Sequence, residues 1–295
     1  MKMLLLGKNG QLGWELQRSL APLGELSSVG RSDGADLDDP QALTHLVRNL
    51  RPDVIVNAAA HTAVDRAESE PELAHRINAL APELLAREAA ALGALLLHFS
   101  TDYVFDGSGT HARDERAATA PINVYGRSKL DGEEGIRASG CRHLIFRTSW
   151  VYAARGGNFA KTMLRLASER DRLRVIDDQT GAPTGADLLA DLSAHALRVV
   201  AQRPDLGGTY HATAAGSTTW HGYARFVIDW ARSHGHPIVV APDAIEAVES
   251  VDFPTPARRP MNSRLDCTRL LHNFGLSLPR WQDGVRRMLT EVLTP

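Results

Sequence analysis

The sequence predicts an α/β fold built on a doubly wound parallel sheet, followed by a smaller C-terminal lobe. In the first half, short apolar runs alternate with stretches of helical periodicity, which is typical of strands joined by helical crossovers. A glycine-punctuated turn follows the first apolar run. After about residue 150 the pattern loosens into helices separated by turn-rich segments. We therefore predict one domain over residues 1–150 and the lobe over 151–295, with some later segments returning to the first sheet.

Each expected element follows from local pattern. Asp39 and Pro40 supply a cap and a first helical residue for the helix that follows them. Buried strands are expected at 3–6, 26–29, 53–57, 94–99 and 144–146. Helices are expected at 11–23, 40–50 and 71–92, the last interrupted by Pro82, and then at 158–170, 188–200, 219–233 and 281–292. Turn-rich stretches lie at 179–185 and 253–260.

Composition narrows the class of protein. The chain has 295 residues, a formal net charge of -2 and 43% hydrophobic residues, so intrinsic disorder is not expected. Acidic and basic residues are near balance with no basic stripe, so neither nucleic acid nor a membrane surface is an expected partner. Cys141 and Cys267 form no short-spaced motif, which argues against disulfides and zinc. The apolar N-terminal run is too short for a signal or a membrane span, and we expect a soluble cytoplasmic protein.

The glycine turn points to a dinucleotide. Gly7 permits a tight turn after the first strand, Gly10 lets backbone approach a pyrophosphate, and Gly13 allows close helix packing. The free N–H groups of the following helix would face the phosphates. The spacing is GxxGxxG rather than GxGxxG, so the motif alone is weak evidence for a Rossmann-type, dinucleotide-binding first domain.

The end of the second strand bears on the choice of cofactor. An acidic residue there usually holds a ribose hydroxyl, whereas an arginine accepts a phosphate. Here Arg31 follows with no immediate acid, which favours NADPH, although a solvated loop arginine is almost as good an interpretation. Asp36 and Leu37 follow closely enough to contact the adenine.

Tyr125 and Lys129 form the most informative pair. Residues four apart on a helix share one face. A free tyrosine has a pKa of about 10, and a nearby ammonium lowers that pKa, so that the phenol can protonate an oxygen as hydride arrives at carbon. Such a pair by itself is more often an exposed structural one.

The hydroxyl of Thr101 favours a functional interpretation of Tyr125 and Lys129 over a structural one. Thr101 ends the fourth strand, upstream of Tyr125, where it can share a substrate oxygen with the phenol and stabilise negative charge on it. Strand, hydroxyl, tyrosine and lysine in this order favour hydride chemistry at a carbonyl or alcohol carbon.

This combination resembles the extended short-chain dehydrogenase/reductase superfamily. The resemblance spans nearly the whole chain, and STDYVF and RPMNS are far more specific than the glycine loop. The motifs that carry it are GKNGQLGWE at 7–15, NAAAHTAVD at 57–65, STDYVF at 100–105, YGRSK at 125–129, RTSWVY at 147–152, GAPT at 181–184 and RPMNSRL at 259–265.

The resemblance implies roles for particular residues. It implies a catalytic trio of Thr101, Tyr125 and Lys129. By itself His61 would be a structural histidine and Trp150 a core residue. The resemblance places a further set of residues at the dinucleotide, together with the three glycines, Arg31, Tyr125 and Lys129. These are Gln11, Leu12, Asp36, Leu37, Ala60, His61 and Thr62. Those implied at the substrate, besides Thr101, are Asp102, Tyr103, Trp150, Asn158 and Arg259.

Within the superfamily the motifs are closest to reductases of dTDP-linked keto-sugars. This implies NAD(P)H-dependent reduction of the C4 keto group of dTDP-4-dehydro-β-L-rhamnose to dTDP-L-rhamnose. One alternative is a nucleotide-sugar dehydratase or epimerase, but Asp102 is followed by Tyr103 where a dehydratase typically has a second carboxylate. The other is a non-catalytic NADP-binding regulatory subunit.

The resemblance also implies a homodimer in which acidic side chains share Mg²⁺. The matching positions are Glu15, Asp187 and Glu291, and oxygen ligands suit this ion. Asp187 departs from the family pattern, since its side chain is one methylene shorter than the family's glutamate. A second departure is Gly30, where the family often has aspartate, which favours NADPH or the use of both cofactors.

Overall fold

The computed structural model describes residues 1–293, which contain a six-stranded sheet in the order β10-β5-β4-β3-β1-β2. Every neighbouring pair in it is parallel. Its strands are β1 (Lys2–Leu6), β2 (Glu25–Val29), β3 (Val54–Asn57), β4 (Leu95–Thr101), β5 (Arg142–Thr148) and β10 (Gly208–His211). The predicted doubly wound sheet is confirmed, with β1 and β3 at the point where the strand order reverses.

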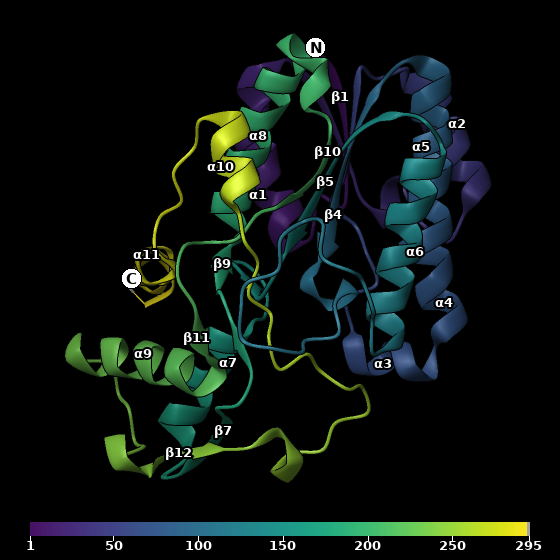
Figure 1. Cartoon of the computed structure of the whole chain (residues 1–295). Coiled ribbons are helices and arrows are strands. Elements are labelled where there is room, and N and C mark those ends of the chain that lie inside the picture. The colour runs from purple at the N-terminus through teal and green to yellow at the C-terminus, as the bar shows by residue number, and fades with distance from the viewer. Residues whose placement is uncertain (294–295) are drawn as a thin grey trace.

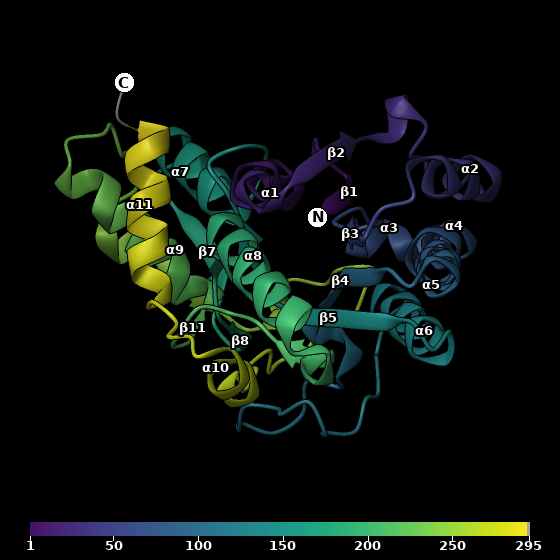
Figure 2. The same ribbon diagram turned by 90° about the horizontal axis from the view of Figure 1, so that it is seen from above.

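Helices cover both faces of this sheet (Figures 1 and 2). The helices α1 (Gln11–Leu20), α8 (Ala186–Gln202) and α10 (Thr268–Phe274) pack on one face. The other face carries α2 (Pro40–Leu50), α5 (Ala81–Leu92) and α6 (Val124–Ala138). Strand side chains alternate between the two cores, since Met3 and Leu5 face the first and Leu4 and Leu6 the second. Both faces of the sheet are therefore covered by apolar side chains, as is usual for an all-parallel sheet.

The C-terminal half divides its elements between two places. β10 and α8 join the first sheet, as expected of some later segments. The helices α7 (Phe159–Glu169), α9 (Trp220–Ser233) and α11 (Trp281–Leu293) form separate apolar clusters, seen at the lower left of Figure 1. Three two-stranded sheets complete this half: β6 (Val151–Tyr152) with β9 (Thr184–Gly185), β7 (Leu173–Ile176) with β12 (Ile245–Val248), and β8 (Thr180–Gly181) with β11 (Thr218–Thr219). The split into two functional lobes near residue 150 stays a prediction.

Some helix bounds differ from expectation for local reasons. The helix predicted at 71–92 is α4 (Pro71–His75), a π-helical turn over Arg76–Leu80, and α5. Pro82 causes no break, because it falls in the first turn of α5, where no intrahelical donor is needed. α3 (Val64–Ser69) and α10 have too few residues to show a helical period and were not predicted.

Helix α6 approaches its neighbours unusually closely. A Cβ on Gly126 would lie 2.2 Å from the carbonyl oxygen of Tyr103, and one on Gly132 would lie 2.1 Å from that of Asn78. Both glycines are buried. The absent side chains therefore set the depth at which α6 lies beside β4.

None of the helices within residues 1–293 combines the length and the apolar character needed to cross a bilayer.

We predict that Gly132→Ala destabilises the fold by about 1–3 kcal/mol, because the new methyl would overlap backbone rather than a flexible side chain. Urea unfolding monitored by circular dichroism measures this. Gly157→Ala is the matched control, since a Cβ there meets nothing within 4 Å. Equal stability of the two variants would contradict the close packing of α6.

Candidate active site

The first part of the site is the glycine turn after β1. Gly7 has φ +91°, a left-handed conformation, and a Cβ on it would lie 2.9 Å from the backbone of Ala58. A Cβ on Gly13 would lie 2.0 Å from the oxygen of Gly7. Gly10 precedes α1 with no side-chain cap and no acid in the first turn, so the helix N–H groups stay available to an anion. The turn thus has the shape and polarity that a dinucleotide phosphate needs.

The segment after β2 is tied together by ion pairs. Arg31, with 80% of its side chain exposed, donates from Nε to Asp36 at 2.8 Å. Leu37 is buried in the core, so little of its side chain is open to a ligand. Asp33, which the sequence reasoning missed, accepts from the backbone N–H of Gly30 at 2.8 Å and pairs with Lys8 at 2.8 Å. An acid therefore does stand near the end of β2, held by a lysine of the glycine turn.

The segment after β3 carries the other predicted cofactor residues. The backbone of His61 is clamped by the Asn78 side chain, which accepts from its N–H at 2.8 Å and donates to its carbonyl at 3.0 Å. Within the described chain, His61 Nδ1 is buried without a hydrogen-bond partner, and its Nε2 lies 3.7 Å from Glu70. Ala60 is half-buried and Thr62 exposed. A loop fixed in this way at the carboxyl end of β3 fits one wall of a dinucleotide site.

The structure brings Thr101 and Tyr125 together. Thr101 ends β4, and its hydroxyl is near enough to the phenol of Tyr125, in the first turn of α6, to lower the pKa of that phenol. The Thr101 hydroxyl itself donates to Oδ1 of Asp102 at 3.1 Å. The ring of Tyr103 packs edge-on against Tyr125 with centroids 5.6 Å apart. A hydroxyl and a phenol therefore meet at one point, as a shared substrate oxygen would require.

The pKa of Tyr125 moves in the opposite direction from our expectation. Burial raises it to about 12, and the hydrogen bond with Thr101 opposes this only in part. The reason is that the ammonium expected to lower it is engaged elsewhere. In the chain without cofactor the phenol is thus a firmly protonated acid.

Lys129 is buried and points toward β4. Its Nζ lies 2.6 Å from the carbonyl oxygen of Phe99 and 3.1 Å from Nε2 of His98. Burial lowers the pKa of Lys129 to about 8, with the Glu133 carboxylate opposing the shift. His98 was not foreseen as a site residue, because one histidine in an apolar strand carries no signal of its own.

Asp102 and Tyr103 follow Thr101 in a short 3₁₀ turn. Burial raises the pKa of Asp102 to about 7, while hydrogen bonds with Ser263 and Thr101 oppose the shift. Its Oδ2 is buried and meets no donor among residues 1–293. This carboxyl is therefore available to a ligand hydroxyl.

Trp150 is held in a strained conformation. Its φ is +49°, which a bulky residue rarely adopts, and its ring stacks on Trp220 with centroids 3.6 Å apart and planes 11° apart. A Cβ on Gly181 would lie 2.6 Å from the indole, so only glycine fits there. Backbone strain of this kind concentrates at functional positions. The contact of Trp150 with substrate stays a prediction.

The two weaker substrate candidates are placed differently. Arg259 donates to Asp65 at 2.7 Å and lies near the phenol of Tyr103, which places it at the site. It also lines a cavity of about 590 Å³ beside the short segment 249–259. Asn158 instead caps α7, accepting from the N–H of Lys161 at 3.1 Å, and its amide lies 3.5 Å from Gln11. The cofactor candidate Leu12, in the first turn of α1, packs against the core.

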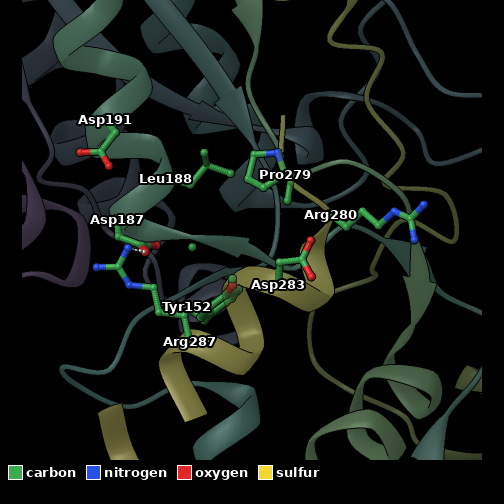
Figure 3. A pocket seen from close by; sticks show the side chains of 11 residues that line it. Tyr152, Asp187, Leu188, Asp191, Pro279, Arg280, Asp283 and Arg287 are labelled. Carbon is green, nitrogen blue, oxygen red and sulfur yellow. Dashed lines mark ion pairs between the residues drawn. The ribbon is translucent and has the colours of Figure 1, made fainter. Parts of the chain in front are cut away.

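The predicted metal ligands line one small pocket but are paired with arginines. Glu15, Asp187 and Glu291 face it together. Arg287 lies 3.7 Å from Asp187 and 3.5 Å from Glu291, and Arg18 lies 3.5 Å from Glu15. Figure 3 shows the Arg287–Asp187 pair at the rim of the adjoining cavity of about 290 Å³. Within residues 1–293 no three such ligands are grouped as a metal ion requires, so the set does not fit Mg²⁺ in one chain.

Comparison with known proteins decides the family. A model of the RmlD substrate binding domain matches residues 1–294. This chain belongs to that family. A dTDP-4-dehydrorhamnose reductase of Escherichia coli K12 is 55% identical over 297 residues, covering 100% of this chain and 99% of the relative. One of Burkholderia thailandensis is 45% identical with full coverage of both chains.

Solved structures of the RmlD family agree with the fold. A dTDP-4-dehydrorhamnose reductase of Clostridium acetobutylicum superposes with a TM-score of 0.90 at 33% identity, covering 99% of each chain. One of Bacillus anthracis, in complex with NADP, superposes with a TM-score of 0.88 at 34% identity, covering 99% of this chain and 100% of that one.

Proposed function

We propose that this chain reduces the C4 keto group of dTDP-4-dehydro-β-L-rhamnose with NADPH or NADH, giving dTDP-L-rhamnose. The observation that carries the proposal is the meeting of Thr101 and Tyr125 in a chain 55% identical to dTDP-4-dehydrorhamnose reductases. The glycine turn supports a dinucleotide beside them, and a family member is known in complex with NADP.

The residues divide the chemistry between them. A bound reduced nicotinamide supplies the hydride. Tyr125 gives its proton to the oxygen that becomes the alcohol, and its high pKa keeps that proton in place until the oxygen becomes basic. Thr101, whose hydroxyl donates to Oδ1 of Asp102 at 3.1 Å in this structure, would turn that proton to the same oxygen. Lys129, whose pKa of about 8 lies near neutrality, can return a proton to the tyrosinate.

The substrate end of the site is supported by the residues around Tyr103. Asp102 offers a free carboxyl oxygen to a sugar hydroxyl, and Trp150 offers the edge of a rigid stacked ring. Arg259 stands where it can reach a diphosphate, next to the cavity beside segment 249–259. In this proposal residues 1–150 mainly bind the dinucleotide and 151–295 mainly bind the substrate.

The alternatives are less well supported. A dehydratase needs a second carboxylate where this chain has the half-buried ring of Tyr103. A regulatory subunit has no need for the Thr101 hydroxyl and the Tyr125 phenol to lie together. The cytoplasm is the proposed location, since both cysteines are free thiols.

We expect Tyr125→Phe to lower kcat by about 10²–10⁴-fold, because the acid is lost while the ring remains. Loss of absorbance at the reduced cofactor's band, with the keto-sugar nucleotide as substrate, measures this. Tyr103→Phe is the matched control, since it removes a neighbouring phenol and should change KM more than kcat. Full turnover by Tyr125→Phe would rule out the proposed acid.

The rate of reduction should fall as the pH rises through about 8. Below this pH Lys129 is an ammonium that can return a proton, and above it the amine cannot. Tyr125, with a pKa of about 12, keeps its proton over the same range. A profile of kcat that stays level from pH 7 to 9.5 would show that Lys129 does not limit turnover.

The Mg²⁺-linked homodimer implied by the resemblance is a separate proposal, and the arginine contacts weigh against its metal. We expect the solution mass and the activity to be the same in EDTA and in Mg²⁺, because Arg287 already pairs with Asp187 and Glu291. Light scattering after size exclusion measures the mass. Arg287→Ala, which frees both carboxylates, is the variant expected to gain sensitivity to Mg²⁺. Dissociation of the unaltered chain in EDTA would contradict this view.

A further inference from the structure

A chain of three buried polar side chains lies behind the catalytic tyrosine. Asn57 ends β3, His98 lies beside it in β4, and Lys129 reaches them from α6. Asn57 Nδ2 lies 3.2 Å from His98 Nδ1, and His98 Nε2 lies 3.1 Å from Lys129 Nζ. Each of the three residues is at most 2% exposed.

The hydrogen bonds of Asn57 fix which of its amide atoms faces the imidazole. Asn57 Oδ1 accepts from the backbone N–H of Ala59 at 3.2 Å. The amide therefore turns its NH₂ group toward His98, and an NH₂ group can only donate. His98 Nδ1 must accept, so it carries a lone pair and no proton.

This orientation determines the contact with Lys129. A neutral imidazole whose Nδ1 is bare carries its proton on Nε2. Burial and the charge of Lys129 hold the pKa of His98 well below its usual value, so the ring is neutral. An Nε2–H facing an ammonium would set two donors against each other, whereas the lone pair of an uncharged amine can accept it. The amine still donates to the carbonyl of Phe99 at 2.6 Å.

We propose that Asn57 fixes His98 as its Nε2–H tautomer, and that this N–H stabilises the uncharged amine of Lys129. The inference rests on the proposed function, because the amine is the form that remains when Lys129 has given a proton to the tyrosinate. When Lys129 gives up a proton that serves to reprotonate the tyrosinate, the lone pair on Nζ accepts the hydrogen bond from His98, and solvent later restores the ammonium. His98 and Asn57 are positioning residues that act through Lys129.

The other charged groups near Lys129 do not supply this effect. Glu133, one turn along α6, favours the ammonium, but its carboxylate is held by Arg147 through two hydrogen bonds of 2.8 and 2.6 Å and by Ser100 at 2.6 Å. Tyr125, one turn in the other direction, is a neutral phenol. The imidazole is thus the group in contact with Nζ that favours the uncharged form.

The tautomer can be read directly in the full chain without cofactor or substrate. Two-bond ¹H–¹⁵N spectra of histidine-labelled protein distinguish Nε2–H from Nδ1–H, and His98→Gln assigns the signal. We expect a neutral Nε2–H ring from pH 6 to 9. A charged ring or an Nδ1–H tautomer would overturn the proposal. Because no turnover is needed, this result is separate from a failure of the enzyme to reduce the keto-sugar.

The kinetic test reverses the donor and acceptor roles in the hydrogen bonds that join Asn57, His98 and Lys129. Asn57→Asp replaces the donor with a carboxylate that accepts from Nδ1–H, which leaves Nε2 to accept from the ammonium. The alkaline limb of the kcat profile should then move up by at least one pH unit, a tenfold rise in the proton affinity of Lys129. His98→Gln, whose amide oxygen can also accept, should move it the same way. If both variants have a lower rate but the alkaline limb of the kcat profile stays at the same pH, Asn57 and His98 have only a structural role.

A matched control exists on the surface. Asn49 lies 2.7 Å from Nε2 of His45 in an exposed pair on α2. Asn49→Asp makes the same chemical change to an asparagine–histidine pair far from α6, and should leave the pH profile unchanged. A limb that moves equally in Asn49→Asp would show that added negative charge, rather than the tautomer of His98, causes the shift.

Discussion

The close approach of α6 to the end of β4 is the constraint on which the rest of the site depends. Gly126 lets the first turn of the helix lie directly on the carbonyl of Tyr103, and Gly132 lets the next turns lie on that of Asn78. Because the helix lies so deep, a phenol from its first turn meets a hydroxyl from the strand. The lysine one turn later then lies in the interior, where it contacts the carbonyl oxygen of Phe99 and the imidazole of His98.

Burial at this depth sets the chemistry as much as the contacts do. Taken out of water, Tyr125 holds its proton more tightly and Lys129 holds its proton less tightly. Burial thus raises the pKa of the phenol and lowers the pKa of the ammonium, which favours transfer of a proton from Lys129 to a tyrosinate. Transfer of a proton from the Lys129 ammonium to the Tyr125 phenolate is therefore more favourable here than between a free ammonium and a free phenolate. Glu133 beneath them is held by Arg147, Arg137 and Ser100, and its charge opposes only in part the effect of burial on the pKa of Lys129.

Much of the fold could be predicted from local pattern, because each buried strand is an apolar run and most helices show a clear period. β4 was foreseen as 94–99 and is Leu95–Thr101, since polar Ser100 and Thr101 continue the strand without continuing the apolar run. The pairing of Thr101 with Tyr125 could also be predicted from their order. The turn of Lys129 toward His98 could not, because it depends on backbone contacts at two glycines that no pattern of side chains reveals. The strained φ of Trp150 is likewise imposed by distant packing against Gly181 and Trp220.

The same stacking joins Trp150 to other elements of the C-terminal half. Trp220, which holds the ring of Trp150, donates from its indole N–H to Gln179 at 3.1 Å. Gln179 in turn donates to Ser250 at 2.8 Å, and Ser250 lines the cavity next to Arg259. A continuous set of contacts therefore joins the aromatic stack to the segment that borders the cavity. Since Trp220 and Ser250 are only half-buried, this set of contacts lies close to the surface, where a ligand at segment 249–259 can reach it. Binding energy gained at one end of a long substrate could in this way help to position its other end.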